Sequence, residues 1–349
     1  MNNLQRYINN ANISRFRLIF QILAFLLLIY GGYLSIHIGT SIPTFACPYN
    51  QECPGTCYLI SAQHQLHNTW SDLFGFRGKA FLTGFITFVL LFLVINKAWC
   101  GYVCPLGTIQ DWITKLRSFF GVKFSRYDEL SFKRLKIIKF VLLILLVLIP
   151  LGMSNSLLGL PLFSHDLSAP FCQICPGRVI TPLFIGDTSQ LVVDFTNPTT
   201  MIMSTLGILV LALFFIGSFF KKRFFCFFCP MSALHSLFSS IAFLRLNKKG
   251  ENCTRCGNCY RVCDVGIKAI AEDLEHTYMV KDDCMLCLKC VEACPENDCL
   301  KASFLTIPVF SSTEEGFFKR NLHLDHEMQN PSNQSNNKDI TKNDDSETK

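Results

Sequence analysis

The chain has 349 residues, of which 50% are hydrophobic and 33 are phenylalanine, and its mean hydropathy is +0.31. These values are high for a soluble protein and favour segments that lie in a bilayer. The formal net charge is +6, but the basic residues stand beside apolar runs and no basic motif is interleaved with aromatic residues, which argues against a nucleic-acid partner. The 18 cysteines stand mostly in short repeated spacings, so we expect metal or redox chemistry.

Four apolar runs predict membrane-spanning helices, because each is nearly long enough, at about 1.5 Å per residue, to cross a hydrocarbon core of about 30 Å. One short run alone could be a buried helix, but four would leave no soluble core large enough to bury them all. The first run is too long and lies too deep in the chain to be a cleaved signal peptide. The runs cover residues 18–36, 80–95, 137–153 and 201–220.

The distribution of Lys and Arg predicts the orientation of these spans. Basic residues gather near the N-terminus, in residues 97–139 and in residues 221–249, whereas the connections 37–79 and 154–200 carry few. By the positive-inside rule, both termini face the cytoplasm and the two poor connections face the periplasm. We therefore expect a multi-pass protein of the bacterial inner (cytoplasmic) membrane.

The membrane region repeats one plan in two halves: a span, an outer loop with close cysteines, a second span, an inner Cys-Pro motif and an amphipathic helix. Apolar residues recur at helical spacing after each inner motif. The second motif is one residue shorter than the first, so the two need not be equivalent. The motifs are Cys100 and Cys104 before Pro105, and Cys226 and Cys229 before Pro230.

The C-terminal part contains the run C-x-x-C-x-x-C-x-x-x-C twice, and proline follows the second copy. This run resembles that of bacterial ferredoxins, in which three close thiolates hold one [4Fe-4S] cluster and the fourth reaches a second cluster. The resemblance implies one cluster on Cys253, Cys256, Cys259 and Cys294, and a second on Cys263, Cys284, Cys287 and Cys290.

Two features stand outside this pattern. Asp264 occupies the place where proline is usual after the first run, but proline supplies no ligand. Cys299 follows the second run and is interpreted as a spare thiol. Zinc is the alternative occupant, since C-x-x-C pairs also build tetrahedral zinc sites.

The inner motifs behind paired spans, together with the C-terminal double run, resemble the NapH-type membrane polyferredoxins, relatives of MauN and of the membrane part of NosR, over residues 15–300. The resemblance implies an iron–sulfur electron-transfer protein and a possible quinol dehydrogenase subunit. Such a subunit relays electrons from the quinone pool toward a periplasmic ferredoxin or reductase. The alternative is a membrane maturation factor that delivers cytoplasmic electrons to periplasmic disulfides or to a metalloenzyme cofactor.

The expected fold is an α-helical integral membrane protein with about four transmembrane helices in two repeat halves and a C-terminal α+β ferredoxin-like domain. The membrane domain covers residues 1–246 and the double-cluster domain residues 247–310. Residues 311–349 are polar and are expected to be a disordered tail.

The cysteines of the membrane domain leave several interpretations open. The four inner cysteines could hold a further cluster, act as redox thiols, or only end the spans. The outer cysteines could form disulfides, which an oxidising periplasm permits, or remain free, or act as a redox centre built from Cys53, Cys57, Cys172 and Cys175. A fifth outer cysteine is Cys47.

A few polar residues are candidates for proton or cofactor chemistry. His64 and His67 lie three apart in the first outer loop and could ligate a haem or take a quinol proton. Asp111 and His235 follow the inner motifs and are proton-acceptor candidates. The chain has no Ser-His-Asp order, phosphate-binding glycine loop or nucleotide fingerprint, which argues against hydrolases and direct NAD reduction.

Overall fold

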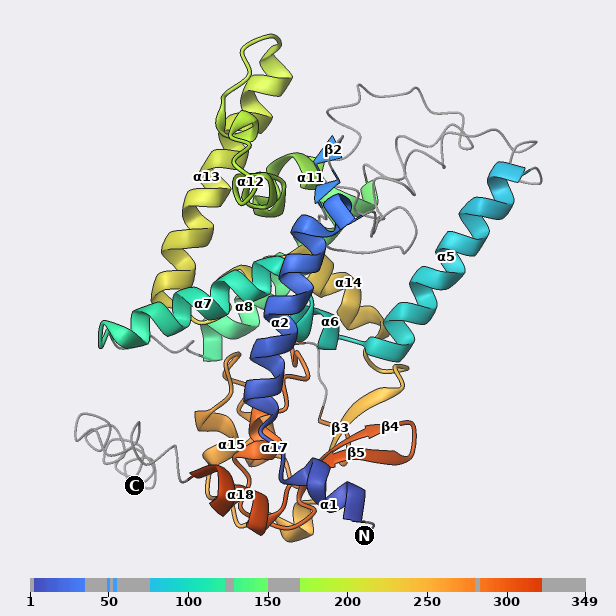
Figure 1. Ribbon diagram of the computed structural model, residues 1–349, viewed down its shortest axis with the longest axis vertical. Helices are drawn as coiled ribbons and strands as arrows, with labels where there is room; N and C mark the ends of the chain where they lie inside the picture. Colours follow the sequence, from blue (N-terminus) through green and yellow to red (C-terminus); the bar gives the residue numbers. More distant parts are fainter. Residues whose placement is uncertain are drawn as a thin grey trace, which may run out of the picture.

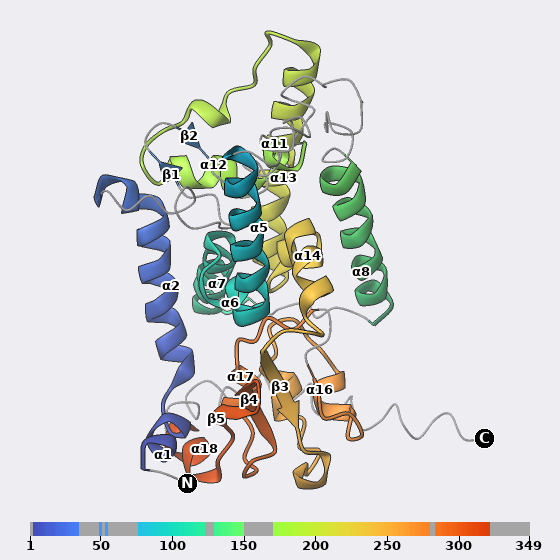
Figure 2. The ribbon, with the colours of Figure 1, turned by 90° about the vertical axis from the view of Figure 1, so that its right-hand side faces the viewer.

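The computed structural model describes residues 3–34, 49–50, 53–54, 76–122, 129–149, 170–279 and 283–321. Long helices stand along the longest axis of the molecule in Figure 1, and a smaller domain that contains a sheet lies at one end of them. Figure 2 shows the same arrangement from the side. The long helices are α2 (Ile13–Tyr30), α5 (Phe76–Ile95), α8 (Glu129–Leu143) and α13 (Pro198–Phe220).

Two of the described helices are long and apolar enough to cross a membrane: α2 with the turn η1 that follows it (Gly31–Leu34), and α13. They coincide with the first and fourth predicted spans. Only 33% and 28% of their apolar windows are buried, and large side chains such as Leu23 and Leu209 are exposed. Apolar surface of this kind marks contact with lipid or with another protein, which suggests a membrane protein.

The second and third predicted spans fall on α5 and α8. Within α5 the apolar stretch is shorter, Leu82–Ile95. Helix α8 begins with charged residues, and its apolar half continues into the π-helical turn η2, Ile144–Leu148. That these two helices also cross the bilayer stays a prediction.

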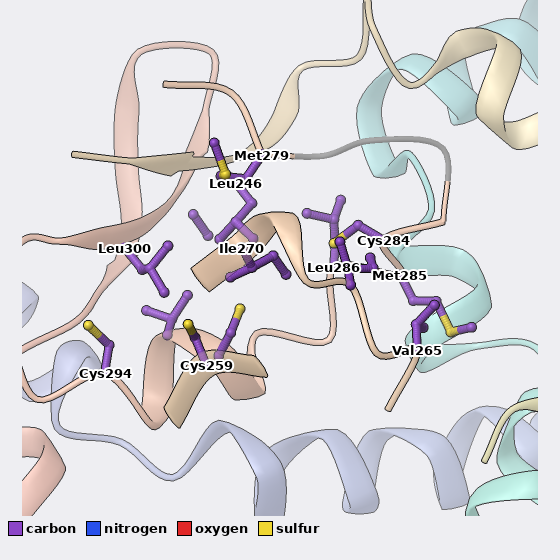
Figure 3. Close-up of a cluster of buried hydrophobic side chains, with 14 of the residues drawn as sticks. Leu246, Cys259, Val265, Ile270, Met279, Cys284, Met285, Leu286, Cys294 and Leu300 are labelled. Atoms are coloured by element: carbon purple, nitrogen blue, oxygen red, sulfur yellow. The ribbon is translucent and has the colours of Figure 1, made fainter. Parts of the chain in front are cut away.

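The C-terminal domain contains a three-stranded antiparallel sheet in the order β3-β4-β5. Its core gathers side chains from the strands and from the short helices that lie between β3 and β4 in the chain, and Figure 3 shows Leu246 and Leu300 beside Ile270. The elements are β3 (Leu244–Lys248), α15 (Asn258–Arg261), α16 (Ala269–Glu272), α17 (Lys289–Glu292), β4 (Leu300–Phe304) and β5 (Ile307–Ser311).

Order extends further toward the C-terminus than the sequence predicts. Beyond β5 the helix α18 (Glu314–Asn321) packs beside α1 (Asn3–Asn9), so the expectation of a disordered tail from residue 311 is wrong for residues 311–321. These residues are ordered by tertiary contacts. The guanidinium of Arg320 donates hydrogen bonds to the carbonyl oxygens of Asn9 at 2.8 Å and Glu292 at 3.1 Å. A polar segment can be ordered by such hydrogen bonds without burying much apolar surface.

Shorter elements complete the described chain. The strand β1 (Tyr49–Asn50) pairs antiparallel with β2 (Cys53–Pro54). Cys47, Cys57, His64 and His67 lie outside the described residues. The remaining elements are α6 (Ala98–Tyr102), α7 (Pro105–Phe119), α11 (Pro170–Ile174), α12 (Pro176–Leu183), η4 (Ser189–Leu191), η5 (Phe224–Phe227), α14 (Pro230–Phe238) and η6 (Gly250–Asn252).

Candidate iron–sulfur centres

Four cysteines of the two C-terminal runs line a first cavity, together with Ile270 and with Cys299, which lies outside the runs. Three of the four come from the first cysteine run and one from the end of the second run. In Figure 3, Cys259 and Cys294 lie on the same side of Ile270. The four are Cys253, Cys256, Cys259 and Cys294.

A second cavity lies on the other side of Ile270, which lines both. Figure 3 shows Cys284 on this side. Arg17 and Asp264 also line the cavity. Its cysteines are Cys263, Cys284, Cys287 and Cys290, the second set that the ferredoxin resemblance implies. That the two sets ligate clusters stays a prediction.

The two cysteine loops share an unusual backbone. Arg255 and Gly257 in the first loop have φ angles of 56° and 72°, and Leu286 and Leu288 at the equivalent places of the second loop have φ angles of 50° and 60°. The left-handed conformation costs a residue with a Cβ about 1–2 kcal/mol, and strain of this kind gathers at ligand sites. The repeated conformation indicates loops shaped to wrap their thiols around a bound group.

The chemistry of the donors fits an iron–sulfur cluster. The first cavity is lined by five cysteines and the second by four, and thiolates are the usual ligands of such clusters. Burial raises the pKa of Cys259 to about 11 and that of Cys284 to about 12. These thiols therefore need positive charge beside them before they lose their protons, and the iron of a cluster would supply it.

Cys299, interpreted from the sequence as a spare thiol, lines the first cavity and is only 2% exposed. A hydrogen bond from Cys299 lowers the pKa of Cys294 to about 7. The Sγ of Cys299 also lies 3.8 Å from the carbonyl oxygen of Lys249. The spacing of the cysteine runs could not reveal this contact, because the position of Cys299 depends on the start of β4.

The four inner cysteines lie close to one another in the structure. Burial raises the pKa of Cys104 to about 11, and the neighbouring Cys226 adds to the effect. Gln110 of α7 joins the two halves of the repeat: its Nε2 donates to the Sγ of Cys226 at 3.6 Å, and its Oε1 accepts from the backbone N–H of Phe225 at 3.0 Å. Cys104 and Cys229 each stand directly before the proline that begins a helix, α7 and α14.

The inner motif lies directly against the second cavity. Gly101, between Cys100 and Cys104, packs so closely on Met285 that a Cβ on residue 101 would lie 2.7 Å from the carbonyl oxygen of Met285. Met285 itself lines the second cavity. The absence of a side chain at residue 101 therefore lets the inner motif and the cysteine loop touch.

A third Cys-Pro helix start, which the sequence reasoning overlooked, belongs to the outer cysteines. Cys175 precedes Pro176 at the start of α12, and its backbone angles (φ −68°, ψ 127°) are close to those of Cys229 (φ −68°, ψ 117°). Cys175 is buried and adds to burial in raising the pKa of Cys229. Cys172 lies in α11, and β2, which contains Cys53, packs against α12. Among the outer cysteines that the structure describes, Cys175 thus lies against the inner set.

The two proton-acceptor candidates are poor bases in this structure. Burial alone would raise the pKa of Asp111, but Arg223 and Arg17 outweigh it and hold that pKa below its ordinary value. The Nε of Arg223 donates to Asp111 at 2.8 Å. Burial and the charge of Lys97 lower the pKa of His235 to about 3. Asp111 is therefore an ionised partner of two guanidinium groups, and His235 is neutral at physiological pH.

Two family models match the chain. A 4Fe-4S binding domain matches residues 78–126 and 203–249, which contain the two inner Cys-Pro motifs. A 4Fe-4S dicluster domain matches residues 245–295, which contain both C-terminal cysteine runs. No solved structure matches the chain significantly.

The chain also resembles several curated proteins. It is 29% identical to the uncharacterized protein MJ0750 of Methanocaldococcus jannaschii over 63% of this chain and 77% of that one. It is 24% identical to the ferredoxin-type protein NapH of Escherichia coli over 62% of this chain and 66% of that one. The protein NirI of Paracoccus denitrificans is 22% identical over 62% of this chain, which spans only 29% of NirI.

The cysteine-lined cavities and the matching 4Fe-4S models define the class: the chain is an iron–sulfur electron-transport protein. Its relatives include ferredoxin-type NapH proteins, so the chain is similar to the NapH-type polyferredoxins.

Proposed function

We propose that the chain is the membrane subunit of a quinol dehydrogenase, which passes single electrons from the quinol pool along its clusters toward a periplasmic ferredoxin or reductase. The observation that carries this proposal is one continuous row of sulfur sites. The first cavity meets the second at Ile270, and the second meets the inner cysteines where Gly101 packs on Met285. A row of close redox sites is what stepwise electron transfer requires.

In this proposal the C-terminal domain holds two [4Fe-4S] clusters. The first lies in the cavity of Cys253, Cys256, Cys259 and Cys294, and the second in the cavity of Cys263, Cys284, Cys287 and Cys290. The supporting observations are the two all-sulfur donor sets and the matching left-handed residues of the two loops. The dicluster family model covers the same residues.

The inner cysteines form a further redox centre, for which a third cluster is the best candidate. Backbone N–H groups of Gly107 and Ser232 bond to the sulfurs of Cys104 and Cys229, each in the first turn of its helix. Such hydrogen bonds and the helix N-termini favour thiolates. The 4Fe-4S model that matches both inner motifs also supports a cluster at this place.

The test is the metal content and spectrum of the full-length chain, purified anaerobically in detergent. We expect about eight irons for the two C-terminal clusters, or about twelve if the inner cysteines hold a third. Cys294→Ser should remove one cluster, whereas Cys299→Ser, a matched change in the same cavity, should remove none. Adding a quinol to membranes should reduce the clusters. Stoichiometric zinc without iron, or clusters that no quinol reduces, would contradict the proposal.

One observation favours a second function, in which electrons run from a cytoplasmic donor to periplasmic disulfides or to a metal cofactor. Cys175 lies beside Cys229 and brings the pair of Cys172 and Cys175 within reach of the inner set. Thiols at that place could exchange with a partner's disulfide. If a reduced cytoplasmic ferredoxin, and not a quinol, makes this pair accessible to thiol-specific reagents, the second function holds.

A further inference from the structure

A network of six charged side chains lies between the second cavity and the inner cysteines. Asp264 pairs with Lys289 at 2.6 Å, with Lys222 at 3.5 Å and with Arg17 at 3.6 Å. Arg17 also pairs with Asp111, which pairs with Arg223 in turn. Arg17, near the start of α2, therefore joins the two carboxylates. The six side chains are Arg17, Asp111, Lys222, Arg223, Asp264 and Lys289.

The network contacts the backbone of the inner motif on one side. The Nη1 of Arg223 donates to the carbonyl oxygen of Cys100 at 2.9 Å, and the Nε of Arg17 donates to the carbonyl oxygen of Gly101 at 3.0 Å. Arg223 interacts electrostatically with the thiols of Cys100 and Cys104. The charge of Arg223 therefore acts on the inner cysteines.

On its other side the network forms part of the second cavity. Arg17 and Asp264 line that cavity, and Asp264 directly follows Cys263 in the chain. Arg17 and Lys289 both interact electrostatically with Cys287. One set of connected charges therefore faces both sulfur sites.

The centre of the network is buried, whereas Lys222 and Lys289 at its edge are 33% and 31% exposed. The exposed side-chain fraction is 4% for Arg17, 1% for Arg223 and 6% for Asp264. Among the described residues of the network, four cations meet two carboxylates, and in a low-dielectric interior a charge acts over a longer distance than in water. Stability alone is a weak reason for such a network, because desolvation of buried charges offsets much of their attraction.

We propose that this network sets the reduction potentials of the cluster in the second cavity and of the inner centre, and so fixes the energy step between them. Each centre gains one electron from its reduced neighbour and gains one negative charge with it. Nearby positive charge stabilises the reduced form and raises the potential, since net charge is one of the factors that set it. The inference rests on the proposed function, because it requires that the clusters are bound.

Single substitutions of the network should move the midpoint potential in opposite directions. Asp264→Asn removes a negative charge beside the second cavity at nearly constant size, so the potential of that cluster should rise. Arg17→Gln removes a positive charge and should lower it. Arg17→Lys keeps the charge but not the planar guanidinium, so the midpoint potential of the cluster should stay close to that of the wild type. The measurement is an EPR-monitored redox titration of the purified full-length chain in detergent.

The matched control is Glu315→Gln, which removes an equal charge from a surface carboxylate paired with Arg6 at 2.9 Å and should leave every potential unchanged. Iron content is measured for each variant; if Arg17→Gln loses its clusters, Asp264→Asn and Arg17→Lys still decide the question. Clusters present in the variants with wild-type potentials, or Asp264→Asn lowering the potential, would overturn this inference alone. A wild-type chain without iron would contradict the proposed function itself.

Discussion

Lys139 of α8 forms an ion pair with Asp283, the residue directly before Cys284. The side chain of Lys139 is 0% exposed and that of Asp283 11% exposed, so the pair lies almost entirely out of water. The pair joins the third predicted span to the second cysteine loop. A helix of the membrane domain and the second cavity are thus held together by one buried contact.

Breaking this pair should weaken the whole C-terminal domain. Lys139→Met should cost about 3–5 kcal/mol of stability, because it leaves a largely buried carboxylate without its cation. The readout is the urea concentration at which the clusters lose their visible absorbance. Lys301→Met is the control, since its ion pair with Asp298 is partly exposed and should cost less than about 1 kcal/mol. Equal midpoints for the two variants would refute the prediction.

His235 should make the stability depend on pH. Its pKa is about 3 in the folded chain and about 6.5 when unfolded, so on acidification the unfolded chain binds the proton first. The free energy of folding that the neutral His235 contributes is fully present above about pH 6.5. It has fallen by about 2 kcal/mol at pH 5 and falls further until about pH 3. His235→Phe keeps a ring beside Phe92, whose centroid lies 4.1 Å away, but cannot take up a proton. Between pH 8 and pH 5, the urea midpoint of unfolding should therefore fall less in this variant than in the wild type. Equal falls of the midpoint in the two proteins would contradict the prediction.

The outer cysteines should act as one redox unit. Replacing any one of Cys53, Cys57, Cys172 or Cys175 by Ser should stop quinol-linked electron delivery while both C-terminal clusters keep their spectra, because Ser ligates metals and exchanges disulfides poorly. A purely structural disulfide would instead lower the protein's abundance and leave activity per folded molecule largely intact. Activity per cluster in membranes decides between these outcomes. Near-normal values in all four variants would exclude the redox role.

The Lys and Arg distribution predicts the topology. Residues near Gln51 and Gln190 should face the periplasm, whereas Lys123 and the C-terminal domain should face the cytoplasm. Single cysteines introduced at these positions in whole cells can be labelled with a membrane-impermeant thiol reagent. Reporter fusions provide an independent check, and periplasmic activity of a fusion after residue 300 would show that the orientation is reversed.

Sequence spacing was informative about local structure. The three close cysteines of each ferredoxin run line the same cavity, because a short loop can present its thiols to one cavity at set spacings, whereas the exchange of Cys263 and Cys294 between the runs was implied only by the resemblance. The two amphipathic helices after the inner motifs were predicted for the same reason: helical periodicity is local, and α7 and α14 begin at Pro105 and Pro230 as expected.

Contacts between distant segments were beyond such reasoning. From the sequence, Asp111 was a candidate proton acceptor, because nothing near it in the chain shows that Arg17 and Arg223 form ion pairs with its carboxylate. The burial of Cys175 against the inner set depends on how α11 and α12 fold back onto α13. Ionic and packing contacts of this kind have no period along the chain, so they become visible only in three dimensions.

The packing of α1 on the C-terminal domain has a consequence for the rate of electron transfer. Asn9 accepts from the backbone N–H of Ser311 at 3.0 Å, and the backbone N–H of Ser14 donates to Glu292 at 3.0 Å. These bonds hold the domain to α1 and to the first turn of α2, and so act as a short tether that keeps the second cavity at a high effective concentration beside the inner motif. Loosening the tether would leave every redox centre chemically intact and still slow the flow of electrons, because tunnelling depends on the separation that the tether maintains.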